Sequence, residues 1–467
     1  MKYVLAFLVV IALAAAGFLW YAGRFEAPAI RIAQPAKAVG VDATLDVSVE
    51  APKGDLTQLD ITLEQGGKSV PLFSLASPAS ASLTQETPDR LRITRAIGKR
   101  ALPDLQAGPG RIVVKAARKG PYGLRTREAS SSKEFSARFT PPRIGVVSIH
   151  HFINLGGSEF VVYRASPPDV VSGVQVGDRF YPGYTASGFG VPGGDGTLKV
   201  AFFALLHDQD TTTPINLVAR DEAGNQARAS FDYRVFPKKF SRGRIELSDP
   251  FLQRVVPEIL DHTPELKTAV SQPEDYLAAY LKINRDLRQA NMQKVVDLTS
   301  GPSAPQVLWK GPFLPLGNAS IESGFADHRT YFYQGKEVDQ QVHLGFDLAV
   351  TVNIPVKAGN DGKVVYADYL GIYGNCVIID HGLGVSSLYG HLASIDVKAG
   401  DAVTRDQVVG RSGMTGLAGG DHLHFSIQVQ GRPVNPVEWW DPHWIDDRVL
   451  RKIREAGGQA ALPTVGR

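Results

Sequence analysis

The sequence of 467 residues has one cysteine, Cys376, which excludes an intramolecular disulfide and any zinc site built from several cysteines. Cys376 lies in the short apolar run NCVIID, so we expect a buried strand residue rather than a nucleophile. An excess of one charge sign is also lacking, because 50 Lys and Arg stand against 47 Asp and Glu. This balance offers no broad basic face for a nucleic acid, and we expect no nucleic-acid partner.

Glycine and proline, by contrast, are abundant, with 47 and 30 residues. Both favour turns, so their number indicates a β-rich body. At roughly 150 residues per domain, the length suggests about three folded units. With 43% hydrophobic and 21% charged residues, the composition is that of a globular protein and argues against both wholesale disorder and a polytopic membrane protein.

The first segment contains a long hydrophobic run, since residues 3–23 carry no charge between Lys2 and Arg24. A helix of this length reaches roughly 30 Å at about 1.5 Å per residue, the thickness of a bilayer hydrocarbon core. The run predicts a transmembrane (TM) helix. We therefore expect residues 1–25 to be a single-pass membrane anchor, with the rest of the chain outside the cytoplasm.

A cleaved signal peptide is the alternative interpretation of this segment, with Ala14-Ala15-Ala16 as the small residues of a cleavage site. The apolar core of a signal peptide spans only about 7–15 residues, and Trp20 and Tyr21 are typical of a membrane interface. The uncleaved anchor is therefore favoured over the signal peptide.

The middle of the chain has alternating apolar and polar residues between Gly, Pro and Asp turns, as in TLDVSVEA and RIVVKAARKG. This pattern predicts a β-sandwich over residues 26–140, which Pro141-Pro142 ends. Residues 141–240 continue the pattern and close with a hairpin over 215–235 that resembles the last hairpin of bacterial immunoglobulin-like domains. We therefore predict two tandem β-sandwich (Ig-like) domains.

Between residues 245 and 300 the apolar residues recur at three- and four-residue spacing, which predicts helices. Ser248 and Pro250 supply a helix cap and a first-turn proline, and Pro257 is expected to kink or split the first helix. A second helix is expected from about Pro273. This short helical linker fits a spacer, a docking surface or a lid.

The chemistry is indicated by two strand-like segments in the last third of the chain. In QQVHLGFDLAV, His343, Gly345 and Asp347 share one face of a strand, so an imidazole and a carboxylate flank a gap that a divalent ion could fill. In DHLHFSIQV, His422 and His424 likewise share one face. A soluble surface gains little from two such histidines, so the combination favours a functional site.

The HxxxD segment 343–347, the YGHL segment 389–392 and the HLHF segment 422–425 resemble, in order and spacing, the lysostaphin-type (LytM-type) zinc endopeptidases, which cut peptide bonds in peptidoglycan. An SGF segment at 323–325 and a DHG segment at 380–382 also resemble motifs of that family. The resemblance covers about 310–440. It implies that one Zn²⁺ per chain is bound by His343, Asp347 and His424, and that the catalytic residues are His391 and His422.

The resemblance implies a zinc-dependent endopeptidase that hydrolyses peptide cross-links of peptidoglycan during cell-wall remodelling. Together with the N-terminal hydrophobic run, this predicts a single-pass protein of the inner membrane, held there by residues 3–23, with the catalytic domain in the periplasm or cell-wall space. An HExxH motif is absent, so no helical glutamate serves as base. His391 and His422 are the proposed replacements, with the division of roles between them open. The sequence departs from the family pattern at Met414 and Asp421, which affects loop shape and not the ligands.

The catalytic domain is expected to be a compact antiparallel β fold with a duplicated motif, since VKAG occurs at 356–359 and again at 397–400. Residues 441–467 are expected to form a tail with a short surface helix. The overall fold class is therefore mainly β. Such a domain would bind the stem or cross-link peptides of peptidoglycan in a groove.

Two alternatives accompany the enzyme. Some relatives lack metal ligands and activate a separate cell-wall amidase, but the five-residue set is complete here, which favours catalysis. The long stretch of residues 26–300 also allows autoinhibition, in which an upstream domain covers the groove until a protein activator displaces it.

Overall fold

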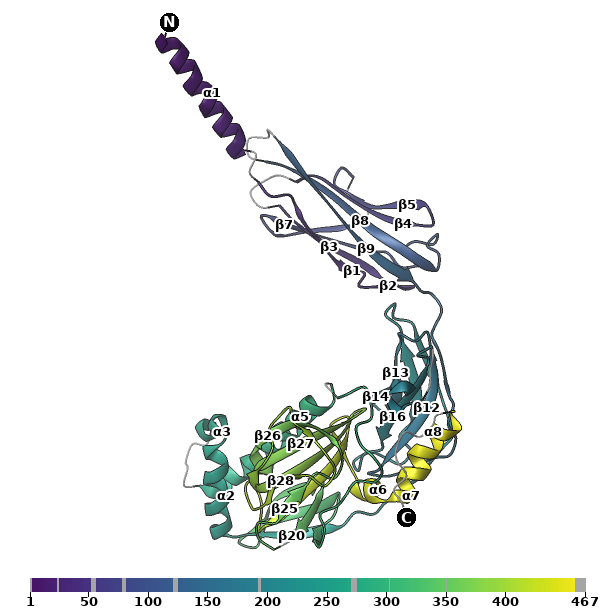
Figure 1. Cartoon of the computed structure of the whole chain (residues 1–467), viewed down its shortest axis with the longest axis vertical. Helices are drawn as coiled ribbons and strands as arrows, with labels where there is room; N and C mark the ends of the chain where they lie inside the picture. Colours follow the sequence, from purple (N-terminus) through teal and green to yellow (C-terminus); the bar gives the residue numbers. More distant parts are fainter. Residues whose placement is uncertain are drawn as a thin grey trace. The chain divides into compact units, whose positions relative to one another are not determined.

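The computed structural model describes residues 2–22, 25–51, 56–77, 81–120, 125–191, 195–269, 275–301, 303–349 and 351–457. The protein is mainly β, as the sequence predicted, with a helical segment before the last third (Figure 1). The chain forms two compact units. Unit 1 comprises residues 1–142 and 220–227, and unit 2 comprises residues 143–219 and 228–467.

Helix α1 spans Lys2–Ala22, so the apolar N-terminal run is helical as predicted. The predicted membrane anchor at residues 3–23 is nevertheless not supported. Crossing a bilayer takes about 20 consecutive apolar residues in a helix. Within the described ranges, no helix satisfies both the length and the apolarity that a membrane crossing demands.

Unit 1 contains a sandwich of two sheets, with strand orders β1-β3-β7-β6 and β2-β9-β8-β4-β5. Val47 and Ile93 from the first sheet and Ile61 and Val114 from the second are fully buried in one cluster, so the sheets pack face to face. The strands are β1 Ala29–Gln34, β2 Ala38–Val39, β3 Thr44–Glu50, β4 Leu56–Gln65, β5 Lys68–Ser74, β6 Ser82–Thr87, β7 Arg90–Ala96, β8 Gly108–Lys119 and β9 Thr126–Ala137.

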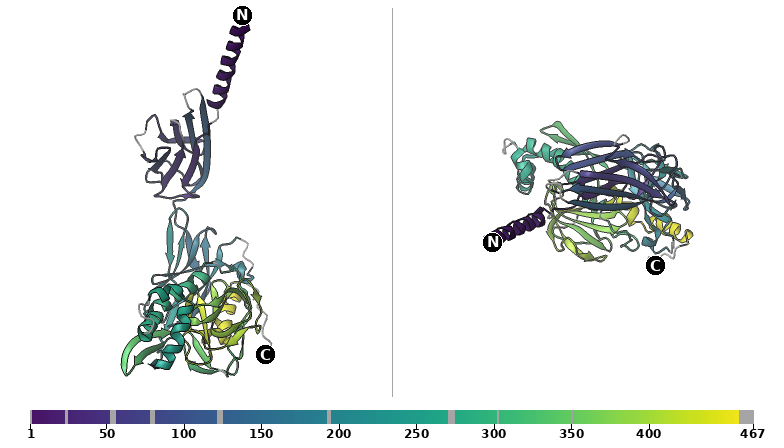
Figure 2. Two further views of the ribbon diagram at one scale, coloured as in Figure 1. Left: turned by 90° about the vertical axis from the view of Figure 1, so that its left-hand side faces the viewer. Right: turned by 90° about the horizontal axis from the view of Figure 1, so that it is seen from above.

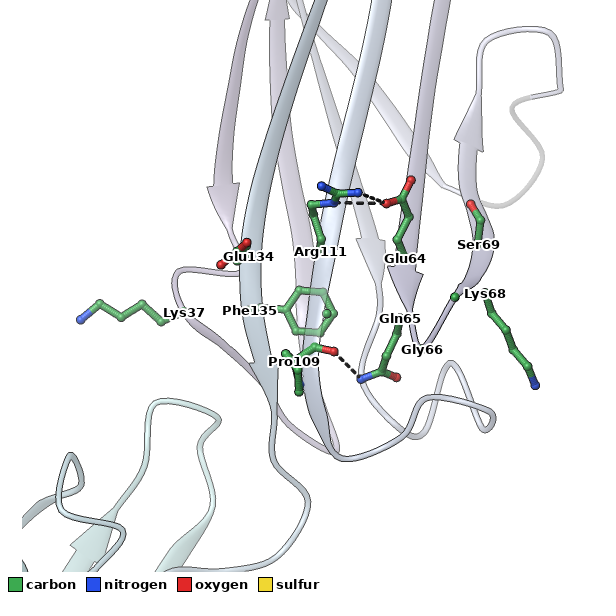
Figure 3. A pocket seen from close by; sticks show the side chains of 12 residues that line it. Lys37, Glu64, Gln65, Gly66, Lys68, Ser69, Pro109, Arg111, Glu134 and Phe135 are labelled. Atoms are coloured by element: carbon green, nitrogen blue, oxygen red, sulfur yellow. Dashed lines mark hydrogen bonds and ion pairs between the residues drawn. The ribbon is translucent and has the colours of Figure 1, made fainter. Parts of the chain in front are cut away.

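A surface hollow of about 700 Å³ lies beside the β4–β5 turn of this sandwich (Figure 3). Its Arg111 side chain donates to Glu64 over 2.5 Å between Nη2 and Oε2, and Gln65 donates to the carbonyl of Pro109 over 3.3 Å. The hollow contains none of the residues that the motifs singled out, and these polar groups satisfy one another.

The sandwich of unit 2 has sheets ordered β10-β12-β16-β15 and β14-β13-β17-β18, plus a parallel pair, β11 and β19. Strands β17 and β18 are neighbours, as the predicted hairpin requires, but the second strand ends at Ala229, and Tyr233–Phe236 form β19, which pairs with β11 instead. The strands are β10 Arg143–Val146, β11 His151–Asn154, β12 Ser158–Ser166, β13 Val171–Val176, β14 Arg179–Pro182, β15 Tyr184–Thr185, β16 Leu198–Ala204, β17 Ile215–Arg220, β18 Gln226–Ala229 and β19 Tyr233–Phe236, with a 3₁₀ turn η2 at Ala186–Phe189.

The last third is built on a ten-stranded sheet whose main path runs β21-β24-β31-β28-β27-β26-β29. Off this path, β30 pairs with β28 and β25, and β32 pairs with β31. A smaller sheet, β20-β22-β23, adjoins it in the chain. The strands are β20 Arg242–Leu247, β21 Ser320–Ser323, β22 Asp327–Tyr333, β23 Lys336–His343, β24 Phe346–Ala349, β25 Pro355–Lys357, β26 Gly362–Tyr369, β27 Asn375–Gly382, β28 Val385–Ile395, β29 Ala402–Val403, β30 Val408–Ser412, β31 His422–Val429 and β32 Arg432–Val434, with a 3₁₀ turn η4 at Gly371–Tyr373.

The helical segment comprises α2 Asp249–Asp261, α3 Pro264–Ala269, α4 Tyr276–Lys282, the π-helix η3 Ile283–Leu287 and α5 Arg288–Thr299 (Figure 2). Ser248 caps α2 as predicted, by accepting a hydrogen bond from Phe251 N. Pro257 does not split this helix, because α2 continues through it and buries its apolar face, including Val256 and Ile259. Pro273, where the second helix was expected to start, lies outside the described residues.

The C-terminal helices are α6 Pro436–Trp440, α7 Pro442–Trp444, the π-helix η5 Ile445–Leu450 and α8 Arg451–Glu455, which lies beside β12 (Figure 1). The expected surface helix is in fact partly buried. Lys452 is fully buried and donates to Glu159 of β12 over 2.7 Å between Nζ and Oε1. Trp439 packs on Phe202 with ring centroids 5.3 Å apart. The second sandwich and the ten-stranded sheet therefore share one core.

Candidate metal centre and active site

Antiparallel pairing brings the predicted site residues together. In the register of β24 and β31, Asp347 lies directly opposite His424. His424 also lies opposite Gly390 of β28, and the next residue of β28 is His391. His343 ends β23, three residues before β24 begins. Four strands, β23, β24, β28 and β31, therefore bring the imidazoles and the carboxylate to one point.

The side chains of His343, Asp347 and His424 form a buried group whose ligand atoms lie within 4.8 Å of one another. The Asp347 Oδ1 atom lies 2.9 Å from His343 Nε2 and 3.1 Å from His424 Nδ1. The two nitrogens are 3.0 Å apart. Ligands at about 2.0–2.1 Å from a tetrahedral ion lie about 3.3 Å from one another, so this spacing and these donor types fit a zinc ion.

The orientation of His343 also suits a metal ligand. Its Nδ1 atom lies 3.2 Å from the carbonyl oxygen of Gly324, which can only accept a hydrogen bond. Nδ1 therefore carries the ring proton, and the lone pair of Nε2 faces the other two ligands. The SGF segment at 323–325 thus contributes a backbone carbonyl that fixes the tautomer of His343.

Gly345 leaves the gap that the sequence pattern indicated. A Cβ atom at this position would lie 2.5 Å from Cε1 and 2.6 Å from Nε2 of His424. Real Cβ atoms do not approach other heavy atoms this closely, so any larger residue would displace the His424 ring. The glycine between His343 and Asp347 is therefore a requirement of the metal site.

The charges at the centre match metal binding. Burial opposes ionisation of Asp347, but the rings of His343, His422 and His424 outweigh it and hold the pKa of that carboxyl well below its usual range. Burial lowers the pKa of His424 to about 4, so this ring is neutral near pH 7. An ionised carboxylate and neutral imidazoles are the protonation states that a metal needs.

Arg329 supports the centre from β22 and was missed by the sequence motifs. Its Nη2 atom donates to Asp347 Oδ2 over 2.7 Å, while Oδ1 of the same carboxylate faces the histidines. Arg329 stands two residues after Asp327 on one strand face, but nothing in the local sequence says that this face reaches Asp347. The ion pair fixes the carboxylate in the orientation that metal binding uses.

His391 and His422 lie beside the group, with their ring centroids 4.8 Å apart. The Nδ1 atoms of both rings lie 2.8 Å from backbone carbonyl oxygens, those of Thr415 and Gly420 respectively. Each Nδ1 therefore carries the proton in the neutral ring, and each Nε2 is free to accept one. His391 also has a positive φ of 62°, a left-handed conformation that non-glycine residues adopt at a cost.

The two rings titrate differently. Burial lowers the pKa of His391 well below its ordinary value. Burial also acts to lower the pKa of His422, but the carboxylate of Asp347, with an Oδ1 atom 3.5 Å from Nε2, raises it overall. A pair of adjacent imidazoles with separated pKa values is suited to general acid and base work.

All five predicted residues line one pocket of about 730 Å³. Three residues of the helical segment, Phe251, Tyr280 and Arg288, line the same pocket, as does Tyr373 from η4. A lid was one of the three roles expected for this segment, but no sequence pattern identified these pocket residues, because the helices approach the sheet through tertiary packing alone. The helical segment is therefore one wall of the groove.

Two further residues that the sequence singled out, His381 in the DHG segment and Cys376, lie outside this pocket. His381 is fully buried and bonded to the carbonyl of Asp361 and to Ser387 Oγ, both at 2.7 Å, so it is structural. Cys376 is fully buried on β27, and burial raises the pKa of its thiol, so it is not a nucleophile.

Comparison with known proteins gives a family for this part of the chain. Residues 341–436 match the model of peptidase family M23. The DD-carboxypeptidase/endopeptidase Mpg of Neisseria meningitidis serogroup B is 40% identical over 97 residues, which cover 21% of this chain and 22% of Mpg. The peptidoglycan DD-endopeptidase ShyA of Vibrio cholerae serotype O1 is 43% identical over 96 residues, which cover 21% of this chain and 22% of ShyA.

The murein hydrolase activator EnvC of Escherichia coli is 39% identical over 95 residues, covering 20% of this chain and 23% of EnvC. The aligned region thus spans less than a quarter of each of these three relatives. Among solved structures, the catalytic domain of lysostaphin from Staphylococcus simulans is 28% identical, and the match covers 32% of this chain and 96% of that domain with a TM-score of 0.20.

The matched range contains His343, Asp347, His391, His422 and His424, whose side chains the fold brings to one pocket. These five residues belong to the HxxxD, YGHL and HLHF segments, which follow one another along the chain in the order that the resemblance requires. Residues 341–436 are therefore a peptidase domain of family M23, the lysostaphin-type class that the sequence resembles.

Proposed function

We propose that the protein is a zinc-dependent endopeptidase that hydrolyses peptide cross-links of peptidoglycan during cell-wall remodelling. The observation that carries this proposal is the convergence of His343, Asp347 and His424, whose ligand atoms lie 2.9–3.1 Å apart in a buried group. These three residues would hold one Zn²⁺ per chain. The bound ion would polarise the scissile carbonyl and lower the pKa of a water molecule from about 16 toward 7.

His391 and His422 would perform the proton transfers. Because each Nδ1 donates to a backbone carbonyl, each Nε2 presents a lone pair to the pocket. One ring would accept a proton from the attacking water, and the protonated ring would then donate to the leaving amine. The second ring would stabilise the negative charge on the carbonyl oxygen once protonated. His422, whose pKa is raised, is the better holder of that positive charge.

The names of the relatives support peptidoglycan peptides as the substrate class. Mpg and ShyA are named as peptidases of the DD class, and ShyA as one that acts on peptidoglycan. A groove of about 730 Å³ accommodates an extended peptide. We therefore propose the stem and cross-link peptides of peptidoglycan as substrates and the periplasm or cell-wall space as the place of action.

The test is product analysis of peptidoglycan digested by the wild type and by His422→Ala, with zinc content measured in parallel. We expect the wild type to release peptide fragments, and His422→Ala to lose cleavage by at least about 100-fold while keeping zinc. His424→Ala should lose both zinc and cleavage. Zinc-loaded wild type that releases no fragments, at any pH between about 5 and 9, would contradict the proposal.

The non-catalytic alternative is favoured only by the similarity to EnvC, which is named as an activator of murein hydrolases. An activator needs no complete ligand set, whereas here the ligand set and both additional histidines share one pocket. If the protein were an activator, adding it to a cell-wall amidase would raise amidase turnover, and His424→Ala would leave that effect unchanged.

A further inference from the structure

The groove has a wall that the M23 sheet does not provide. Phe251 of α2, Tyr280 of α4 and Arg288 at the start of α5 line the same pocket as the candidate metal ligands. This wall is held in place by hydrogen bonds to catalytic-domain loops. The Asn291 Oδ1 atom accepts from Ile372 N over 2.9 Å, and Glu258 Oε1 accepts from Gly416 N over 2.8 Å. Residues on the wall are therefore fixed relative to the metal centre.

Arg288 differs from the other arginine of the pocket. Arg329 is paired with Asp347, whereas the Arg288 guanidinium has no carboxylate oxygen within 4.0 Å among the residues that the structure describes. The acidic residues that line the pocket with it do not pair with it; these are Glu246, Glu322, Asp327, Asp347 and Asp421. Arg288 is thus a half-buried positive charge without a counter-ion on this part of the protein.

The guanidinium is nevertheless firmly oriented. Its Nε and Nη2 atoms donate to the carbonyl oxygen and to Oδ1 of Asn284, over 3.1 Å and 2.6 Å. Asn284 is fully buried and donates in turn to Asp339 Oδ2 over 2.8 Å. An arginine has five N–H donors, and these bonds use only two of them. The remaining donors are available to a ligand in the groove.

Arg288 is also close to the reaction centre. Tyr373 lines the same pocket, with its ring centroid 5.5 Å from that of His424. A group bound by Arg288 would therefore lie in the pocket that His343, Asp347 and His424 line.

An oriented guanidinium with unused donors is the arrangement that recognises a carboxylate through paired hydrogen bonds. We propose that Arg288 binds a free carboxylate of the peptide substrate and makes the enzyme prefer acidic peptides over their amidated counterparts. The proposal rests on the proposed endopeptidase function of this groove. The carboxylate comes from one of two sources: the α-carboxylate at the end of a peptide strand, or a side-chain carboxylate near the scissile bond.

The experiment compares synthetic cross-linked peptides that carry either a free acid or an amide at one of these two positions. For the wild type we expect kcat/KM to be about tenfold or more higher for the acid form at one position, as a charge-assisted hydrogen bond implies. Arg288→Gln should abolish this preference. The position at which the wild type discriminates identifies the source of the carboxylate.

Lys294→Gln is the matched control, because it removes one positive charge from the same helix, α5, at an exposed position that does not line the pocket. We expect it to keep the full preference for the acid. Arg288→Lys keeps the charge but loses the paired geometry, so it should lose at least about threefold of the preference. This variant also serves if Arg288→Gln does not fold.

The proposal fails if the wild type cleaves the acid and amide peptides equally at both positions, or if Arg288→Gln keeps the preference. In both cases cleavage by the wild type would still support the endopeptidase function. If the zinc-loaded wild type cleaves neither peptide, the role of Arg288 is tested by calorimetry, which measures the affinity for the same acid and amide peptides. Tighter binding of an acid peptide by the wild type but not by Arg288→Gln supports it, and equal binding overturns it.

Discussion

Replacing Gly345 by alanine tests whether the metal centre depends on close packing. The added Cβ would lie 2.5 Å from Cε1 of the His424 ring and 2.8 Å from the carbonyl oxygen of Phe425. Ordinary carbon contacts begin at about 3.5 Å, so the ring must move by roughly 1 Å. The new methyl group therefore meets a backbone oxygen as well as the His424 ring, and the backbone oxygen cannot rotate away as a side chain can.

A displacement of about 1 Å is twice the tolerance of a functional metal site. We therefore expect Gly345→Ala to weaken zinc binding by about 10- to 100-fold or more, as loss of ligand support does elsewhere. Overpacking should also lower the free energy of unfolding by about 1–3 kcal/mol. Competition with a chromogenic chelator measures the zinc affinity, and denaturant unfolding of the zinc-free protein measures the stability.

Gly324→Ala is the matched control for this experiment. Gly324 also lies beside the centre, and its carbonyl faces His343, but a Cβ there would meet only the Phe346 ring at 3.9–4.0 Å, an ordinary contact. We expect its zinc affinity to stay within about twofold of the wild type. Equal zinc affinity for Gly345→Ala and the wild type would refute the packing argument.

Three further predictions concern groups around the site. Glu258 accepts a hydrogen bond from Gly416 N, next to Thr415, whose carbonyl orients His391. Glu258→Ala should therefore reduce kcat about tenfold without loss of zinc. An unchanged kcat would contradict this role. Arg329→Gln should weaken zinc binding by about 10- to 100-fold in the chelator assay, and unaltered affinity would show that the bond to Asp347 is dispensable. Burial raises the pKa of Glu438 to about 7, above its unfolded value of 4.5, so its contribution to stability is complete below pH 4.5 and is lost as the pH rises through 7. Denaturant titrations of the zinc-free proteins compare the wild type with Glu438→Gln at several pH values. Between pH 4.5 and 7 the free energy of unfolding of the wild type should fall by about 3 kcal/mol relative to that of Glu438→Gln. If both free energies change in parallel with pH, Glu438 does not titrate in this range.

The sequence predicted the metal ligands because strand alternation and local spacing carry that information. His422 and His424 lie two residues apart on β31 and share a face, as strand alternation requires. The single strand expected through His343 and Asp347 is interrupted at Leu344-Gly345, so His343 ends β23 and Asp347 lies on β24. The meeting of the two pairs depends on the register of β24 with β31, and the likeness to a known family supplied that step.

Residues that act across large sequence separations were not predictable. Arg288 reaches the pocket only because α5 packs against η4, and Arg329 reaches Asp347 only through the pairing of β22 with β23. The tail was expected to form a short surface helix, but its Lys452 is buried. Its partner, Glu159, lies 293 positions earlier and is invisible to any local pattern.

The shared core of unit 2 has a practical consequence for recombinant work. A fragment that begins near residue 310, where the resemblance starts, and keeps the C-terminal helices would uncover the indole of Trp439, which packs on Phe202. Lys452 would lose both β12 groups to which it donates, the Glu159 carboxylate and the main-chain oxygen of Phe160. Apolar surface that the shared core buries would then face water, which lowers the stability of the fragment. The shortest well-behaved expression product should accordingly begin near residue 143, so that the second β-sandwich is kept as an integral part of the folded unit.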